Sequence, residues 1–292
     1  MILFCPLTLG NDWITKKQMR VKVNVSSNSG GSCKTTTSIH LAYELAKAGK
    51  TVTIIELDSN GSVGTFCGLD YDPPAERTLK HVWNEDFSGD YPFEPIWAEY
   101  VPGIQVIRGG RHVEKIGREI PSHGRGYYFL ADRLKEFPID TDVIIFDNPG
   151  TLDMLAIPSY IASDWTLCPL KPEAKDADKV IELLGWMKRK NREFQLDPTP
   201  KMLGFVPTRV DYKRSVHRNI LGVDKNGEVL AADKMPEDAL PIVLAGQNIP
   251  LFPAIRDSAH YLTACQNGCP VSALNERNED YKPIADKILS LL

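Results

Sequence analysis

The sequence predicts an α/β fold in which a mostly parallel central sheet carries helices on both faces. Short β-branched or apolar runs alternate with longer helix-like stretches, as they do in chains built from strand–helix units. The run Val143-Ile144-Ile145-Phe146 is continuously apolar, which suits a central strand that is buried on both faces. No repeat or linker divides the chain, so we expect one domain over residues 19–292.

The elements follow in a regular order. Strands are predicted at residues 21–26, 51–57, 104–108, 142–147, 164–169 and 202–207. Helices are predicted at residues 34–48, 125–137, 174–194, 211–221, 256–267 and 280–292. Residues 70–103 hold five prolines, and we expect an irregular excursion there and another near residues 222–241. Residues 1–18 form an N-terminal extension whose place in the fold the sequence leaves open.

Composition sets the broad class. The 292 residues are 42% hydrophobic and 25% charged, which is ordinary for a soluble globular protein. No window approaches 18 consecutive apolar residues, so we expect no membrane span. The formal net charge of −4 means that any contact with DNA would need a local basic patch. Cys265 and Cys269 lack a second ligand pair for zinc, and we expect the six cysteines to be thiols of a cytoplasmic protein.

A loop that suits phosphate groups follows the first strand. Residues 26–36 read SSNSGGSCKTT and lead into the first helix, with Lys-Thr at the junction, which is the P-loop arrangement. Gly30 and Gly31 would let backbone N–H groups approach phosphate oxygens, and the helix N-terminus would add a favourable field. Lys34 would bridge the β- and γ-phosphates, and the Thr35 hydroxyl would bind Mg²⁺. The strict pattern is broken at Asn28 and Cys33, so a simple Gly-Gly turn remains the alternative interpretation.

Two carboxylates stand at the ends of predicted strands. Asp58 follows the second strand and Asp147 ends the strand that begins at Val143. In open α/β sheets ligands bind at the carboxyl ends of strands, so both side chains are candidates for the phosphate site. Asp147 follows four apolar residues, as the Mg²⁺-binding aspartate of a Walker B strand does. Taken alone, Asp58 could equally be a turn residue before Asn60-Gly61.

Together these motifs resemble the ParA/MinD family of deviant Walker ATPases, over roughly residues 19–292. The resemblance implies a P-loop NTPase fold, ATP and Mg²⁺ as cofactors, and a homodimer with ATP sandwiched at its interface. It implies that Asp58 positions the attacking water and lies near the metal, and that Asp147 supports Mg²⁺. Residues 204–211 resemble the strand whose end meets the adenine, and residues 249–256 resemble the segment that closes over the base. The implied nucleotide-binding residues are Ser29, Gly30, Gly31, Ser32, Cys33, Lys34, Thr35, Thr36, Pro207, Thr208, Arg209, Pro250, Phe252 and Arg256.

One departure from the family pattern is informative. The family's signature lysine, which reaches the partner's ATP across the dimer, falls on Ser29. A serine cannot supply that cation, so positive charge must come from elsewhere. We prefer Lys171 over Lys175 because Lys171 stands at the mouth of a strand, and we expect it to stabilise the transition state from the partner subunit together with Lys34. A serine at this position also resembles the McdA-type ATPases that position carboxysomes.

The resemblance further implies partners. ParA-like ATPases bind DNA without sequence preference, and two basic clusters could do so. We also expect a cargo adaptor or ATPase-stimulating protein, and a nucleoid-associated location when ATP is bound. The tail 281–292 has few basic residues, so we expect no membrane binding. Three alternatives remain: a small-molecule kinase or synthetase, a redox ATPase like the nitrogenase iron protein, and a nucleotide binder without hydrolysis. The basic clusters are Lys188, Arg189, Lys190 and Arg192, and Lys213, Arg214, His217 and Arg218.

Overall fold

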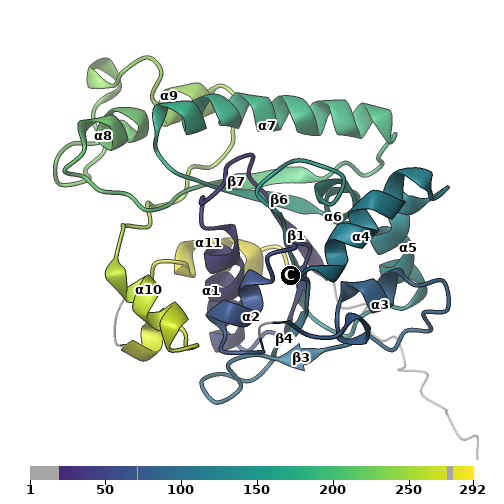
Figure 1. Ribbon diagram of the computed structural model, residues 1–292. Coiled ribbons are helices and arrows are strands. Elements are labelled where there is room, and N and C mark those ends of the chain that lie inside the picture. The colour runs from purple at the N-terminus through teal and green to yellow at the C-terminus, as the bar shows by residue number, and fades with distance from the viewer. Residues whose placement is uncertain (1–19, 71, 275–278) are drawn as a thin grey trace, which may run out of the picture.

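The computed structural model describes residues 20–70, 72–274 and 279–292, with the side chains of residues 174–177 left aside (Figure 1). The extension expected over residues 1–18 lies outside the described residues. A seven-stranded sheet forms the centre, in the order β3-β4-β2-β5-β1-β6-β7. Every neighbouring pair is parallel except β3 and β4, which are antiparallel. The strands are β1 (Val21–Val25), β2 (Val52–Glu56), β3 (Glu94–Pro95), β4 (Ile104–Ile107), β5 (Val143–Asp147), β6 (Trp165–Leu170) and β7 (Lys201–Pro207).

The fold class and all six predicted strands are confirmed, each strand within one residue at either end. The strand that sequence reasoning missed is β3, which lies inside the excursion at residues 70–103 and has only two residues. A strand of two residues is too short to show the alternating pattern by which a strand is recognised in a sequence. It nevertheless ties the excursion to the edge of the sheet by pairing with β4.

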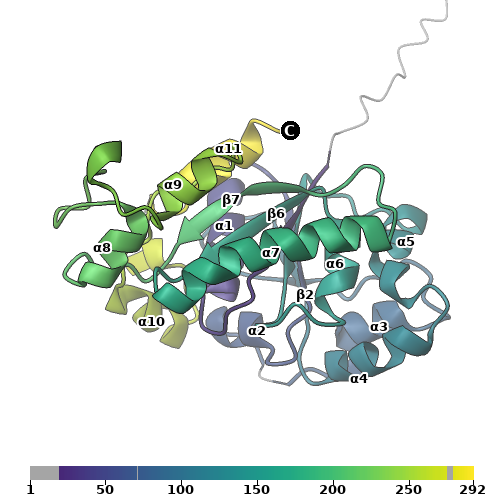
Figure 2. The same ribbon diagram turned by 90° about the horizontal axis from the view of Figure 1, so that it is seen from above.

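Helices cover both faces of the sheet, as predicted. Alternate residues of each strand face opposite sides: Ile54 packs into the core beneath α1 (Lys34–Lys47) and α11 (Lys282–Leu289), whereas Ile55 packs on the other side. Figures 1 and 2 show α8, α9 and α10 at one end of the molecule and α3, α4 and α5 at the other. The second face carries α3 (Leu79–Trp83), α4 (His112–Glu119), α5 (Phe129–Glu136), α6 (Ala156–Ala162), α7 (Ala174–Glu193) and α8 (Ser215–Leu221).

The predicted helices are present, with corrected boundaries. The stretch 125–137 divides into a 3₁₀ turn (Gly126–Tyr128) and α5, and α10 (Ala259–Gln266) begins three residues later than expected. Ser258 caps α10, because its hydroxyl accepts a hydrogen bond from the His260 backbone N–H. Five short helices were not predicted: α2 (Ser62–Phe66), α3, α4, α6 and α9 (Leu240–Ala245). Helix α6 was not predicted because it contains a proline. Pro158 lies in the first turn of α6, where a missing N–H costs no hydrogen bond.

A buried histidine joins the first helix to the C-terminal part of the chain. His40 Nδ1 lies 2.9 Å from the Thr36 carbonyl oxygen, and the Val271 backbone N–H donates to His40 Nε2 over 3.2 Å. The ring is therefore neutral, with its proton on Nδ1. Aromatic rings of Trp97, Tyr261 and Tyr281 surround it at 5.2–5.6 Å. Burial lowers the pKa of His40 from 6.5 to about 4.

This pKa predicts a pH-dependent loss of stability. Because the folded pKa lies below the unfolded one, the contribution of neutral His40 is complete above about pH 6.5 and is lost as the pH falls toward 4. At pH 5 the free energy of unfolding should have dropped by about 2 kcal/mol through this residue. Urea unfolding of wild type and His40→Gln at pH 7.5 and pH 5 measures it. An equal drop in both proteins would contradict the assignment.

Candidate functional site

The candidate site lies at the carboxyl ends of five neighbouring strands. Because the sheet order places β6, β1, β5, β2 and β4 side by side, the segments that follow them share one edge. This edge carries Lys171, the loop 26–33, Asp58 and Gly109 in the segments after the strands, and Asp147 as the last residue of β5. Residues far apart in the sequence therefore meet where parallel sheets bind ligands.

The loop between β1 and α1 has the shape that a phosphate group needs. A Cβ on Gly30 would meet no atom within 4 Å, and one on Gly31 would meet only the Lys171 side chain. Gly31 has a φ of 69°, a conformation that side chains disfavour. The Lys34 ammonium donates to the Ser29 carbonyl oxygen at 3.1 Å, and the Ser32 hydroxyl donates to the same oxygen at 3.1 Å. These two hydrogen bonds hold the loop in its curved conformation, and the concave side of the loop stays open.

Cys33, which stands where the P-loop pattern has a glycine, adopts a backbone conformation that favours glycine. Its φ of 63° lies in the left-handed region, and it directly precedes the first residue of α1. A non-glycine residue pays about 1–2 kcal/mol for this conformation. Burial raises the pKa of the Cys33 thiol, and a hydrogen bond with Thr208 opposes that rise. The loop therefore has the expected geometry despite the broken sequence pattern.

Asp147 forms the acidic centre of the site. Its fully buried carboxylate accepts hydrogen bonds from the Thr35 and Ser38 hydroxyls, each at 2.8 Å. Burial raises the pKa of Asp147 to about 6, while the two hydroxyls and Lys34 oppose the rise. A buried carboxylate that is costly to ionise favours a cation beside it, and carboxylate and hydroxyl oxygens are ligands that Mg²⁺ accepts. These residues fit the magnesium ion that the motif implies.

Sequence reasoning missed Ser38. Ser38 lies three residues after Thr35 on α1, and this helical spacing could have indicated that both face the same carboxylate. Gly150 follows β5, and a Cβ there would lie 3.6 Å from Gly30 Cα and 3.9 Å from the Lys34 ammonium. The loop after β5 thus closes against the phosphate loop.

Asp58 lies beside this centre, with only 8% of its surface exposed. Its Oδ1 accepts hydrogen bonds from the backbone N–H and the side-chain amide of Asn60, both at 2.9 Å. The backbone N–H of Leu57 donates to the Asp147 carbonyl oxygen at 2.8 Å, which joins the ends of β2 and β5. The charges of Asp58 and Asp147 both act on Lys34, whose pKa is lowered by burial and raised by the two carboxylates.

Lys171 extends over the phosphate loop of its own chain. Its ammonium would lie 3.7 Å from a Cβ on Gly31. The Thr208 hydroxyl donates to the carbonyl oxygens of Ser32 and Leu170, each at 3.2 Å. It thereby holds the residue before Lys171 next to the phosphate loop. The side chain of Lys175, the alternative to Lys171, lies outside the described residues.

A cavity of about 480 Å³ opens beside the loop, and its volume suits a nucleoside. Of the residues expected to meet the base, Thr208, Arg209 and Arg256 line it, next to Cys33 and Thr36 of the loop and helix α1.

Pro207, Pro250 and Phe252 do not line the cavity. Phe252 packs against Gly204, where a Cβ would lie 2.6 Å from its ring, and Pro250 accepts a hydrogen bond from the Phe205 backbone N–H at 2.9 Å. Pro207 accepts one from the Ile255 N–H at 2.8 Å. The segment that precedes Arg256 therefore runs as an added strand-like edge along β7.

The two basic clusters differ in which of their side chains are exposed to solvent. Lys188, Arg189 and Arg192 are exposed near the C-terminal end of α7, while Lys190 forms an ion pair with Glu193 at 2.7 Å.

In the second cluster Lys213 and Arg214 are exposed. The guanidinium of Arg218 donates to the carbonyl oxygens of Tyr212 and Lys213, and His217 is buried, accepting a hydrogen bond from the Asp211 N–H. His217 is therefore not a surface cation. Of the helices in the described part of the chain, none has the length and apolar character that a membrane span requires.

Comparison with known proteins identifies the family of this chain. Residues 20–196 match the AAA_31 family, described as an AAA domain. Chromosome partitioning protein ParA of Myxococcus xanthus is 25% identical over 199 residues, covering 68% of each chain. Maintenance of carboxysome distribution protein A of Synechococcus elongatus is 23% identical over 261 residues, covering 89% of this chain and 94% of its own. The expected relationship to ParA/MinD-type proteins is confirmed.

Solved structures share the fold. An ATP complex of a McdA variant from Cyanothece has a TM-score of 0.74 at 20% identity, covering 92% of this chain and 96% of that one. Other structures of this fold hold ADP with magnesium. ATP, ADP and Mg²⁺ are thus ligands found in proteins of this fold.

Proposed function

Since this chain belongs to the AAA_31 family of AAA domains, we propose that it is a positioning ATPase that dimerises with ATP, binds DNA without sequence preference and distributes an intracellular cargo. One observation carries the ATPase part of the proposal. The open loop at Gly30 and Gly31, the Lys34 ammonium and the carboxylates of Asp58 and Asp147 converge on one edge of the sheet. That set of groups binds, orients and neutralises a chain of phosphates.

Each residue has a distinct task in this mechanism. The N–H groups of the loop and the N-terminus of α1 hold the phosphates, and Lys34 turns from the Ser29 carbonyl oxygen to the phosphate oxygens. Thr35 and Asp147 would hold a magnesium ion, which would neutralise charge on the phosphates. Asp58, within the reach of Lys34, orients the attacking water. Catalysis of this kind rests on positioning and on charge stabilisation.

The nucleoside would occupy the neighbouring cavity. Thr208, Arg209 and Arg256 line it, and we assign base and ribose contacts to them. Pro207, Pro250 and Phe252 act indirectly in this proposal, because they hold the segment before Arg256 against β7.

Lys171 would take over from the missing signature lysine. Because β6 lies directly beside β1, the Lys171 ammonium already reaches the phosphate loop of its own chain. We therefore assign its charge to the phosphates of that same chain rather than to those of the partner. Ser29, whose backbone carbonyl accepts from Lys34 and Ser32, serves as a loop residue.

DNA binding is assigned to the exposed cations. The end of α7 offers Lys188, Arg189 and Arg192, and the loop before α8 offers Lys213 and Arg214. Contacts of this kind reach phosphates and weaken steeply as salt rises. The cargo is a carboxysome or a plasmid, by analogy with the relatives, and an adaptor protein would stimulate hydrolysis. The expected location is cytoplasmic, on the nucleoid when ATP is bound.

Light scattering tests this function. The Asp58→Ala variant, which should not turn over ATP, is measured without nucleotide, with ADP and with ATP·Mg²⁺, and plasmid DNA is then added at two salt concentrations. We expect a monomer that becomes a dimer only with ATP and that then binds DNA more weakly at the higher salt. A monomer in every state that binds ATP but no DNA would contradict the proposal and favour a small-molecule kinase or synthetase.

The redox alternative has less support. A cluster shared between subunits needs accessible cysteines, whereas Cys67 and Cys168 are buried in core regions on opposite faces of the sheet. Burial also raises the pKa of the Cys67 thiol, which disfavours the thiolate that iron requires.

A further inference from the structure

We propose that Glu56 is a positioning residue for Asp58: its carboxylate joins two loops that hold the Asp58 backbone in place for water activation. The inference rests on the proposed function, because it assumes that Asp58 orients the attacking water. Glu56 is the last residue of β2 and lies two residues before Asp58, with its side chain buried beneath the site rather than open to it.

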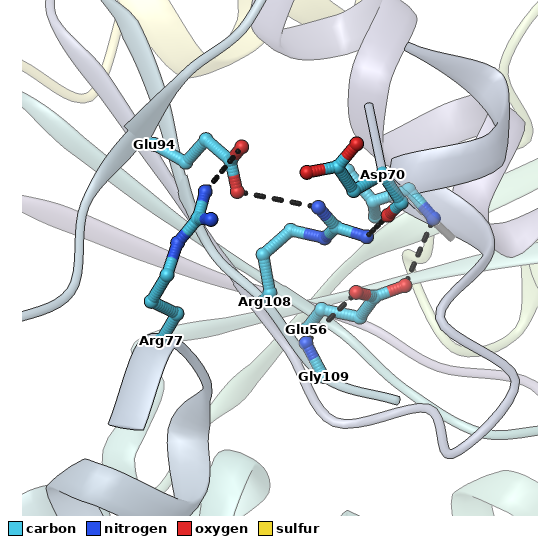
Figure 3. A network of polar contacts seen from close by, with 7 residues as sticks. Glu56, Asp70, Arg77, Glu94, Arg108 and Gly109 are labelled. Carbon is cyan, nitrogen blue, oxygen red and sulfur yellow. Dashed lines mark hydrogen bonds and ion pairs between the residues drawn. The ribbon is translucent and has the colours of Figure 1, made fainter. Parts of the chain in front are cut away.

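The Glu56 carboxylate joins two segments that are distant in sequence. Oε1 accepts a hydrogen bond from the Val63 backbone N–H in the first turn of α2, and Oε2 accepts one from the Gly109 N–H after β4, each at 2.8 Å. Figure 3 shows the carboxylate of Glu56 directed at Gly109. Both oxygens are engaged by backbone donors, so the side chain fixes the two loops relative to each other.

These same loops flank Asp58. On one side the Gly110 N–H donates to the Asp58 carbonyl oxygen at 3.0 Å, and on the other the Gly61 N–H approaches it at 3.3 Å. Gly109 is packed so closely that a Cβ on it would lie 2.6 Å from that carbonyl oxygen and 2.8 Å from Glu56 Cγ. The loop after β4 therefore cannot shift without moving Asp58.

Stability alone does not explain a carboxylate at this position. Glu56 is fully buried, its neighbour in register on β5 is the carboxylate of Asp147, and burial raises the pKa of Glu56 to about 7. A buried charge next to a like charge costs free energy that an apolar residue would avoid. The backbone N–H groups of Val63 and Gly109, however, require an acceptor with two oxygens, and a carboxylate provides it.

Arg108 extends the network to the excursion and provides a matched control. Its buried guanidinium donates to Glu94 Oε2 on β3 at 3.2 Å and to the Asp70 carbonyl oxygen at 2.7 Å (Figure 3). Glu94 also accepts from Arg77 at 3.1 Å. Among the described residues, the side-chain hydrogen bonds of Glu94 thus go to Arg77 and to Arg108, the residue before Gly109, rather than to Asp58 or to the Gly109 backbone.

Steady-state kinetics of Glu56→Gln tests the proposal. Glutamine keeps the shape but presents an amide N–H₂ to one of the two donors, so that one loop is released. We expect kcat to fall roughly 10- to 100-fold, with ATP affinity near wild type and cooperative unfolding retained. Glu94→Gln should turn over ATP at the wild-type rate. Gly109→Ala should lower kcat as well, because the added Cβ pushes the loop after β4 away from Asp58 without changing any charge. This variant tests the proposal if Glu56→Gln does not fold.

Wild-type turnover in a folded Glu56→Gln variant would overturn the inference, and so would wild-type turnover in Gly109→Ala if Glu56→Gln does not fold. So would an equal loss in Glu94→Gln, or a loss of ATP affinity as large as the loss of kcat, because either would indicate general damage. The parent proposal fails separately, if Asp58→Ala leaves turnover unchanged. A low kcat in Asp58→Ala together with normal kcat in Glu56→Gln would thus reject the role of Glu56 alone.

Discussion

Replacing Asp58 with alanine should lower ATP turnover by roughly 100-fold or more while the protein still binds ATP. The carboxylate is 8% exposed and lies beside the Lys34 ammonium, but the phosphate loop itself is held by bonds among Ser29, Ser32 and Lys34. Binding and turnover should therefore separate in this variant. Phosphate release under steady state and fluorescent-ATP titration measure the two quantities.

The matched control for this experiment is Asn60→Ala. Asn60 holds Asp58 through its side-chain amide and its backbone N–H, and only the amide contact is lost in this variant. We expect a smaller fall in turnover than in Asp58→Ala. Turnover in Asp58→Ala within a factor of about two of wild type would reject the assignment of the water-orienting group.

The strands could be predicted because a strand that is buried on both faces has a continuous apolar run in the sequence. A run such as that of β5 has no polar face, and its ends are set by Asp142 and by the turn at Pro149-Gly150. The short helices could not be predicted in the same way. Helices α2 and α3 have five residues each, too few for a helical period, and they are held by tertiary packing of residues such as Val63 and Leu79.

The site could be predicted in part for a related reason. Residues close in sequence, such as Lys34 and Thr35, carry a recognisable spacing, and Asp58 and Asp147 each end a clear strand. Glu56 gives no such signal, because its partner Gly109 lies 53 residues away, and only the pairing of β2 with β4 brings the two together. Long-range contacts of this kind depend on the strand order, which the sequence does not state.

The strand order bears on the role proposed for Lys171. Sequence reasoning expected it to act on the partner's nucleotide, as a signature lysine would. The pairing of β6 with β1 instead brings its ammonium over Gly31 of the same chain. Within the described residues, the phosphate loop is thus approached by two ammonium groups, those of Lys34 and Lys171, before any partner arrives.

Lys171→Ala should weaken ATP-dependent dimerisation roughly 10- to 100-fold, because the dimer forms only on bound ATP and the variant loses one charge-assisted hydrogen bond to the phosphates of its own chain. Lys175→Ala should have a smaller effect, and Lys171→Arg should restore part of the loss. Sedimentation across a protein concentration series with ATP·Mg²⁺ measures the dimer constant. Equal effects of the two alanine variants, or none, would remove the preference for Lys171.

A mixing experiment then distinguishes action on the same chain from action on the partner. In a heterodimer of Lys171→Ala with Asp58→Ala, a lysine that serves its own chain leaves neither site complete, so turnover should stay at the level of the separate variants. A lysine that reaches across would complete one site, because Asp58 of one subunit would meet Lys171 of the other. Recovery toward half of the wild-type rate would therefore contradict the assignment of Lys171 to the phosphates of its own chain, and would return it to the role of the signature lysine that Ser29 replaces.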